Sequence, residues 1–298
     1  MRYLLFCLII SVGCTSAPNE GSQKLKIVCT TGIIADAVSE ITNDSCIVIS
    51  LMGPGTDPHL FKPTKESLDD MASADIIVSN GLHLEGRMQD ILHKLERTKK
   101  VIFLGEALDS ETKLYGDEAK KIPDPHIWFD VEIWKTVITY LGDELLQVAP
   151  ECTDPERIIA YTTQLEDLDI WVSEEMSSIP EPQRVLITAH DAFSYFGRAY
   201  NTEVIGLQGI STMAEYGIRD VTNLVDLVIS REIKAAFVET SVSSRSIEAV
   251  IAGCKDRGYN VKEGGSLYSD ALGGKDSGAA TYIDMVKTNV STIKKALK

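Results

Sequence analysis

The tripeptide Asp-Pro-His occurs twice in this chain of 298 residues, at positions 57–59 and 124–126. Proline stiffens the backbone and bars the preceding residue from the α region, so each imidazole is presented from an extended corner. The aspartate of each copy could accept a hydrogen bond from the second ring N–H. Because the chain has only five histidines, the repeated setting indicates one metal site that contains His59 and His126. Either copy taken alone is explained as well by ordinary turn chemistry.

His190 and Asp270 are the other candidate metal ligands. We expect His190 just past a strand and Asp270 in the loop after the last strand. In open α/β sheets, ligands bind at the carboxyl ends of the strands, and these two residues and His59 are all expected there. His126 is expected in the loop that leads into a helix. Three neutral imidazoles and one carboxylate suit a borderline divalent ion, with five ligand atoms if the carboxylate is bidentate. Taken singly, His190 could be a structural histidine and Asp270 an ordinary loop carboxylate.

Asp191 and Glu239 are candidates for groups that orient the ligands. Asp191 follows His190 directly, and Glu239 ends a predicted strand that points to the same sheet edge. A carboxylate behind a ligating imidazole fixes its ring and tautomer. Asp191 is explained equally well as a charge at a helix start. We interpret the remaining histidines, His83 and His93, as non-ligands.

The elements that must position these residues alternate short β-rich runs with helical periods, which indicates parallel sheets flanked by helices. In the first half we expect strands at 25–31, 46–52, 75–80 and 100–104, helices starting near residues 33, 64, 85 and 131, and a loop at 111–122. In the second half we expect strands at 184–188, 203–207, 235–239 and 260–264 and helices at 193–200, 217–230, 246–258 and 279–298. The fold class is therefore α/β, with two lobes built alike.

One long helix is predicted from Asp154 to Ser178, because apolar residues recur there at spacings of three and four until Pro180. At 1.5 Å per residue it would run roughly 35 Å, so it could cross between the lobes as a rigid strut. We therefore expect a first lobe at 24–152, a linking helix at 153–181 and a second lobe at 182–298, with the metal in the cleft between the lobes.

Composition and the N-terminal sequence limit which partners and which compartment are expected. The net charge of −15 disfavours nucleic acid and anionic membrane surfaces. An apolar run at 3–12 is too short to span a bilayer and is followed by Cys14, which predicts a lipoprotein signal and tether at 1–23, export, and a lipid anchor on Cys14. The other mature cysteines, Cys29, Cys46, Cys152 and Cys254, are scattered singly, which argues against a thiolate zinc site and leaves any disulfide pairing open.

Six segments together resemble the zinc- and manganese-binding solute-binding proteins of ABC importers, the TroA-like metal-binding proteins. They are Gly-Pro-Gly-Thr-Asp-Pro-His at 53–59, Asn-Gly-Leu-His-Leu-Glu at 80–85, Asp-Pro-His-Ile-Trp-Phe-Asp at 124–130, Thr-Ala-His-Asp-Ala-Phe at 188–193, Gly-Leu-Gln-Gly-Ile at 206–210 and Leu-Tyr-Ser-Asp-Ala-Leu-Gly at 267–273. The resemblance implies two lobes joined by one long helix, with His59 and His126 from the first lobe and His190 and Asp270 from the second holding the cargo. It also implies delivery to an inner-membrane permease with a separate ATPase. We expect a monomer.

Two departures from that family pattern bear on the cargo. Zinc-specialised members usually carry a histidine-rich loop before the second Asp-Pro-His, and residues 111–124 contain no histidine. Manganese-specialised members often have glutamate where this chain has His190, which shifts the ligand set toward zinc. The pattern matches the dual zinc and manganese type best. A zinc hydrolase is the alternative from another class, but such an enzyme keeps an open coordination position for water, and four ligands would occupy it. An adhesin role could coexist with transport.

Overall fold

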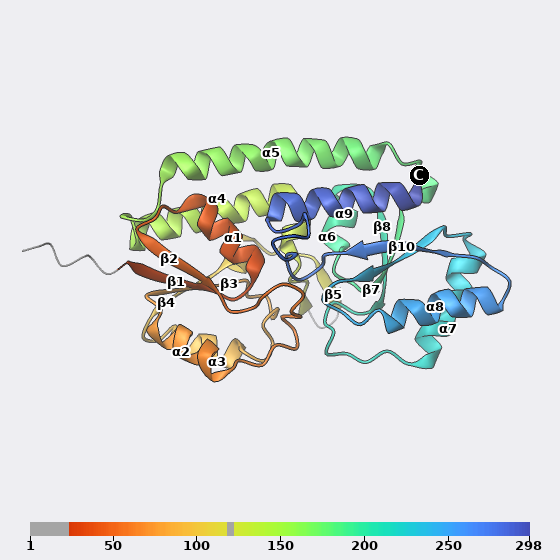
Figure 1. Cartoon of the computed structure of the whole chain (residues 1–298), viewed down its shortest axis with the longest axis horizontal. Coiled ribbons are helices and arrows are strands. Elements are labelled where there is room, and N and C mark those ends of the chain that lie inside the picture. Colours follow the sequence, from red (N-terminus) through yellow and green to blue (C-terminus); the bar gives the residue numbers. More distant parts are fainter. Residues whose placement is uncertain (1–23, 118–121) are drawn as a thin grey trace, which may run out of the picture.

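The structure is a computed structural model that describes residues 24–117 and 122–298. The predicted signal peptide, the tether and Cys14 lie outside the described residues. Two α/β lobes lie side by side along the long axis, and helix α5 (Pro155–Ser177) runs across both of them (Figure 1). This arrangement confirms the predicted fold class. No helix in the described part of the chain is long and apolar enough to cross a membrane.

The first lobe is built on a parallel sheet with the strand order β2-β1-β3-β4. Side chains alternate between its faces, so Ile27 and Val78 pack toward α1 while Val28 and Ile77 pack toward α2 and α3. Burial on both faces explains the continuous apolar runs of the central strands. The elements of this lobe are β1 (Leu25–Cys29), α1 (Gly32–Ile41), β2 (Cys46–Ser50), α2 (Lys65–Ser73), β3 (Ile76–Ser79), α3 (Gln89–Leu95), β4 (Lys100–Phe103) and the 3-10 turn η1 (Leu104–Ala107).

Helix α3 begins at Gln89 and not near residue 85, as the sequence pattern predicted. The buried Glu85 carboxylate instead accepts hydrogen bonds from the Thr30 hydroxyl at 2.7 Å and from the backbone N–H of Asn80 at 2.8 Å. Leu82 and His83 have φ angles of 53° and 66°, which a right-handed helix does not allow. The segment between β3 and α3 is therefore a loop organised around a buried charge.

The predicted loop at 111–122 contains paired strands. Strands β5 (Tyr115–Asp117) and β6 (Ile122–Pro123) pair in antiparallel fashion, so the loop prediction was wrong for these residues; 118–121 lie outside the described residues. Polar sequence without alternation gave no sign of the pairing. After it come η2 (Ile127–Phe129) and α4 (Val131–Val148), whose first turn is capped by Asp130 as predicted.

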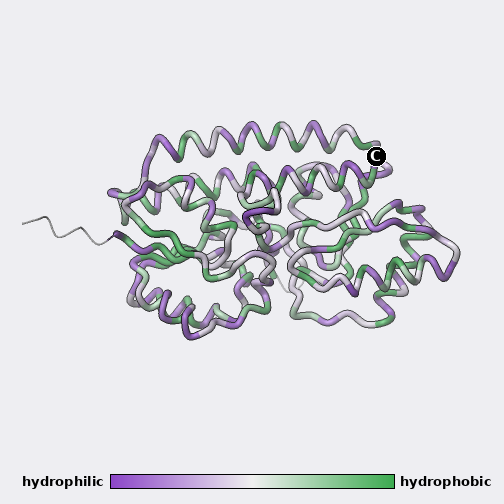
Figure 2. Tube along the Cα trace, in the orientation of Figure 1, coloured by the Kyte–Doolittle hydropathy of each residue, from purple (hydrophilic) through white to green (hydrophobic). Residues whose placement is uncertain are grey.

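Helix α5 has 23 residues and contacts α1, α4 and α9 (Tyr282–Leu297). Its buried positions are Tyr161, Leu165, Leu168, Val172 and Met176, which confirms the predicted apolar stripe. Hydrophobic and hydrophilic residues alternate along α5 in Figure 2, as expected for a helix with one buried face. Because α1 belongs to the first lobe and α9 to the second, α5 packs on both.

The second lobe contains two parallel strand pairs, β7-β8 and β9-β10, and β7 contacts β9. Strand β7 ends at His190, so this histidine is the last strand residue and does not follow the strand as predicted. Strand β10 lies two residues later than predicted at its start, and its register shifts beside Gly265, whose φ is 111°. The elements are η3 (Glu181–Gln183), β7 (Val185–His190), α6 (Ser194–Ala199), β8 (Glu203–Gln208), α7 (Ile218–Ser230), β9 (Ala235–Glu239), α8 (Arg245–Asp256), β10 (Lys262–Leu267) and α9.

Candidate metal centre

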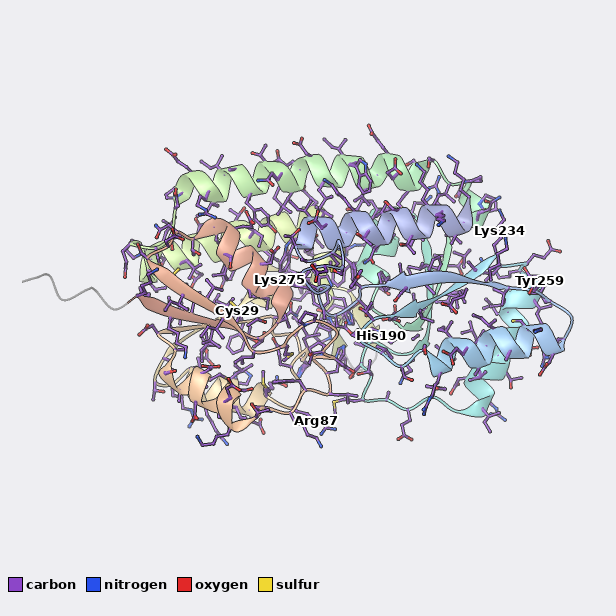
Figure 3. The ribbon with its side chains drawn as sticks, viewed as in Figure 1. Cys29, Arg87, His190, Lys234, Tyr259 and Lys275 are labelled. Carbon is purple, nitrogen blue, oxygen red and sulfur yellow. The ribbon has the colours of Figure 1, made fainter. Side chains whose placement is uncertain are left out.

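Four side chains predicted as ligands meet between the lobes. One donor atom from each of His59, His126, His190 and Asp270 lies within 4.8 Å of the others, and all four residues are buried. They come from the loop after β2, the residue before η2, the end of β7 and the loop after β10. Figure 3 labels His190 near the boundary of the two lobes. The structure thus brings together residues that are far apart in the sequence.

The separations between donor atoms have the size of a metal coordination shell. Nε2 of His126 lies 3.4 Å from Nε2 of His59 and 3.5 Å from Oδ1 of Asp270. Oδ2 of Asp270 lies 3.5 Å from Nε2 of His190. Ligand atoms placed about 2.1 Å from a tetrahedral centre are about 3.4 Å apart, so these edges fit a zinc-sized ion. Because Asp270 turns one oxygen toward each of two imidazoles, it can also bind bidentately, which would give five ligand atoms.

Buried carboxylates stand behind two of the imidazoles. Oδ1 of Asp124 lies 2.7 Å from Nδ1 of His126 and also accepts the backbone N–H of His126 at 2.9 Å. Oε2 of Glu239 lies 2.6 Å from Nδ1 of His190, and Oε1 accepts the backbone N–H of that residue at 2.9 Å. A proton on Nδ1 leaves Nε2 of each ring free to face the centre of the cluster.

Burial and the neighbouring charges shift the pKa values of all four candidate ligands. Burial and the neighbouring imidazoles of His126 and His190 lower the pKa of His59 to about 3. Burial also disfavours the charged form of His126, but Asp124 and Asp270 outweigh it and raise the pKa of that imidazole to about 9. Against the cost of burial, His190 and His126 hold the pKa of Asp270 well below its usual range. Likewise, Glu239 and Asp270 raise the pKa of His190 above its usual range. A metal ion would therefore replace protons on His126 and His190, which lie beside carboxylates, whereas His59 is already neutral.

Two donor atoms at the centre lack protein partners. Nε2 of His190 and Oδ1 of Asp270 are buried and make no hydrogen bond to any residue that the structure describes. Such atoms normally cost stability unless something binds them. Their chemistry, an imidazole nitrogen and a carboxylate oxygen, is the donor set of zinc and manganese sites.

Contacts across the cleft hold the ligand loops in place. Oδ2 of Asp57 accepts a hydrogen bond from the Thr212 hydroxyl at 2.6 Å, and the indole N–H of Trp128 donates to the carbonyl of Ser269 at 3.0 Å. Each contact joins a first-lobe loop to a second-lobe loop beside a candidate ligand. A cavity of about 520 Å³ adjoins His59 and is lined by residues of both lobes.

Other sequence-based expectations for the site have mixed outcomes. Asp57 does not contact the ring of His59, because its Oδ1 accepts the backbone N–H of that residue and its Oδ2 is held by Thr212. Asp191 accepts a hydrogen bond from Ser194 at 2.6 Å, which matches the helix-start interpretation. Ser241 was missed: it donates to Oδ2 of Asp270 at 3.1 Å, and nothing in its local sequence signals that role.

His83 and His93 lie away from the cluster. The ring of His83 contacts Gln89, and that of His93 lies 3.4 Å from Glu96 and packs on Phe103. Neither belongs to the group of donor atoms around Asp270. Their placement agrees with the interpretation of both as non-ligands, which stays a prediction until binding is measured.

Two lobes that contact a common rigid helix and enclose a three-histidine, one-aspartate cluster define a helix-linked solute-binding protein for a metal ion. Comparison with known proteins gives the same class. Residues 27–296 match the family described as "Zinc-uptake complex component A periplasmic", and the chain belongs to that family.

Relatives and a solved structure match nearly the whole chain. The manganese-binding lipoprotein MntA of Bacillus subtilis is 43% identical over 302 residues, covering 100% of this chain and 98% of the relative. The zinc-binding protein TroA of Treponema pallidum is 40% identical over 287 residues, covering 96% and 92% of the two chains. The structure of the periplasmic zinc-binding protein TroA from Treponema pallidum superposes with a TM-score of 0.89 at 39% identity, over 92% of this chain and 99% of that chain.

Proposed function

We propose that this protein captures a divalent transition metal, zinc or manganese, outside the cytoplasm and delivers it to an ABC permease driven by a separate ATPase. The metal is cargo and not a resident cofactor. The observation that carries the proposal is the buried cluster of His59, His126, His190 and Asp270, whose donor atoms lie within 4.8 Å of one another. Family membership and the names of the relatives support the transport role.

The ligand assignment within this proposal rests on orientation as well as proximity. Asp124 and Glu239 lie behind His126 and His190 at 2.7 and 2.6 Å, so the Nε2 atoms of both rings face Asp270. His59 completes the set as a neutral imidazole, since burial lowers its pKa to about 3. We propose all four as ligands of one ion, with Glu239 as an orienting group and Asp191 as a helix-start residue.

The cellular setting is proposed from the N-terminal sequence and the relatives. The apolar run and Cys14 support export followed by lipid anchoring. The relative MntA of Bacillus subtilis is named as a lipoprotein. We propose that the protein is held at the membrane by its lipid alone and acts as a monomer. The zinc hydrolase considered from the sequence gains no support from the family or the relatives.

Titration of metal-free protein against a chelator of known affinity tests the proposal. We expect one zinc or manganese ion per chain, and competition between the two ions should rank them for the three-histidine set. His126→Ala should lower the affinity at least a hundredfold, whereas His83→Ala should leave it unchanged. Circular dichroism and thermal unfolding of both variants show whether they fold. Equal losses at His83 and His126, or no bound ion in the folded protein, would overturn the assignment.

A further inference from the structure

Two buried cysteines of the first lobe, Cys46 and Cys152, both lie beside Asn43. Cys46 is the first residue of β2, at the edge of the sheet, and Cys152 lies in the turn between α4 and α5. Both thiols are unbonded in the structure, as are Cys29 in β1 and Cys254 in α8. Cys254 belongs to a different core cluster, whereas Cys29, Cys46 and Cys152 share one. Strand β1 pairs Leu25 with Cys46, so Cys29 lies four residues further along that strand.

Backbone contacts bring the Cys46 and Cys152 segments together at Asn43. The backbone N–H of Asn43 donates to the carbonyl of Cys152 at 2.8 Å. The backbone N–H and the thiol of Cys46 approach the carbonyl of Asn43 at 3.5 and 3.6 Å. Beside this contact, Thr42 and Thr153 form an antiparallel bridge, which draws the two backbones together. Cys152 thus contacts the backbone N–H of Asn43, and Cys46 contacts its carbonyl.

The surroundings of the Cys152 thiol include Cys46. Burial, followed by the adjacent Cys46 thiol, raises the pKa of the Cys152 thiol to about 12. The thiol of Cys152 otherwise contacts only its own turn, at the carbonyl of Ala149 3.7 Å away. A disulfide needs Cα atoms roughly 4.4 to 6.8 Å apart, and the contacts at Asn43 together with the Thr42–Thr153 bridge bring the two backbones close to one another.

We propose that Cys46 and Cys152 form a disulfide in the exported protein. The proposal does not depend on the metal, but it requires the oxidising compartment that the export signal predicts. One S–S bond forms as the two thiols lose two protons and two electrons. A disulfide of an external oxidant, a protein or a small molecule, accepts them and becomes two thiols. Because both cysteines are buried, the exchange takes place during folding, while the thiols are accessible.

The disulfide would fix the start of the strut to the edge of the first lobe. The Arg157 side chain already reaches the carbonyls of Ser39 and Glu40 at the end of α1, at 3.0 and 2.8 Å. The backbone N–H of Asp154 donates to the carbonyl of Ile41 at 3.1 Å. A covalent bond at Cys152 would close a loop over residues 46–152, which is nearly the whole first lobe. Long loops of this kind give large restriction of the unfolded chain.

Counting thiols tests the pairing directly. Protein exported to the periplasm is lysed directly into denaturant that contains N-ethylmaleimide, so that buried thiols also react, and is then weighed by mass spectrometry. Of the four cysteines that follow Cys14, we expect two, Cys29 and Cys254, to be alkylated before reduction and all four after it. Digestion should yield a linked peptide pair two hydrogens lighter than its parts. In Cys46→Ser, three cysteines should react, whereas Cys254→Ser should keep the link.

Thermal unfolding with and without reductant gives a second reading. Reduction should lower the melting temperature of the wild-type protein by roughly 10 °C. Cys152→Ser should start lower and respond little, and Cys254→Ser should respond like the wild type. If a serine variant fails to fold, the alkylation pattern of the wild-type protein decides alone. If all four cysteines that follow Cys14 are alkylated in exported, denatured protein before reduction, the proposal is overturned.

Discussion

Replacing Asp124 with asparagine separates the charge behind His126 from the hydrogen bonds that orient it. One oxygen, Oδ1, contacts both the ring Nδ1 and the backbone N–H of His126, at 2.7 and 2.9 Å. The other oxygen, Oδ2, is buried and has no hydrogen-bond partner in the described part of the chain. The new side chain would keep an acceptor at Oδ1 and place its amide group at the second position. Asp124→Asn therefore removes a negative charge while the ring keeps its direction.

Two opposing effects of that charge set the expected magnitude. Losing a carboxylate behind a ligating histidine typically lowers metal affinity about 10- to 100-fold. The same carboxylate raises the pKa of His126 to about 9, so at neutral pH a proton competes with the metal. Proton competition with a pKa of about 9 weakens the wild type about 100-fold at pH 7 and about 4-fold at pH 8.5. Loss of the charge lowers the pKa of His126, so the variant loses less affinity to protons at pH 7 and regains less at pH 8.5.

The ratio of wild-type to variant affinity should therefore rise by roughly tenfold between pH 7 and pH 8.5. Zinc binding to metal-free protein, measured by chelator competition at several pH values, gives this ratio without assuming the size of the intrinsic loss. His83→Ala is the control, because its ring contacts Gln89 and lies outside the cluster. A ratio that stays constant over this range would refute the argument that Asp124 stabilises the imidazolium and the metal complex alike.

Three further outcomes are expected. Burial raises the pKa of Asp36, which accepts the backbone N–H of Tyr282, to about 6, so the folded state loses stability as pH rises from 4 through 6. In urea unfolding, Asp36→Asn should raise the free energy of unfolding by about 3 kcal/mol at pH 7 and by less than about 1 kcal/mol at pH 4. Because α5 packs on both lobes, metal loading should change the radius of gyration little in small-angle scattering, and a large contraction would contradict the rigid strut. Loading should nevertheless stabilise the fold by about 4 kcal/mol when the metal concentration is a thousand times the dissociation constant. Cys14→Ser should release the mature protein from membranes on fractionation, and a variant that still sediments after a salt wash would show another anchor.

The sequence was sufficient to predict which site residues follow strands, because a short apolar run and the loop after it are visible in the local sequence. His59 and Asp270 were expected after strands and lie there. Partners from distant segments could not be predicted. Asp57 and Asp124 stand in the same tripeptide, yet only Asp124 contacts its histidine ring, since Thr212 of the other lobe holds Asp57.

Buried polar contacts also explain the errors in the fold. Helical spacing near residue 85 predicted a helix start, but Glu85 accepts hydrogen bonds from Thr30 and Asn80 and keeps the segment folded as a loop. The pairing of β5 with β6 depends on a register between segments of three and two residues, which are too short to show alternation in hydrophobicity. Local propensity carries no information about either contact.

The four candidate ligands are distributed over most of the chain, from position 59 to position 270. The cluster cannot exist on a nascent chain until the loop after β10 has emerged and docked beside the end of β7. Metals that meet the partly synthesised chain therefore find at most the His59 and His126 pair of the first lobe, without His190 and Asp270. The complete site forms only where the last strand folds, so the ions present in that compartment are the ones that the site can select.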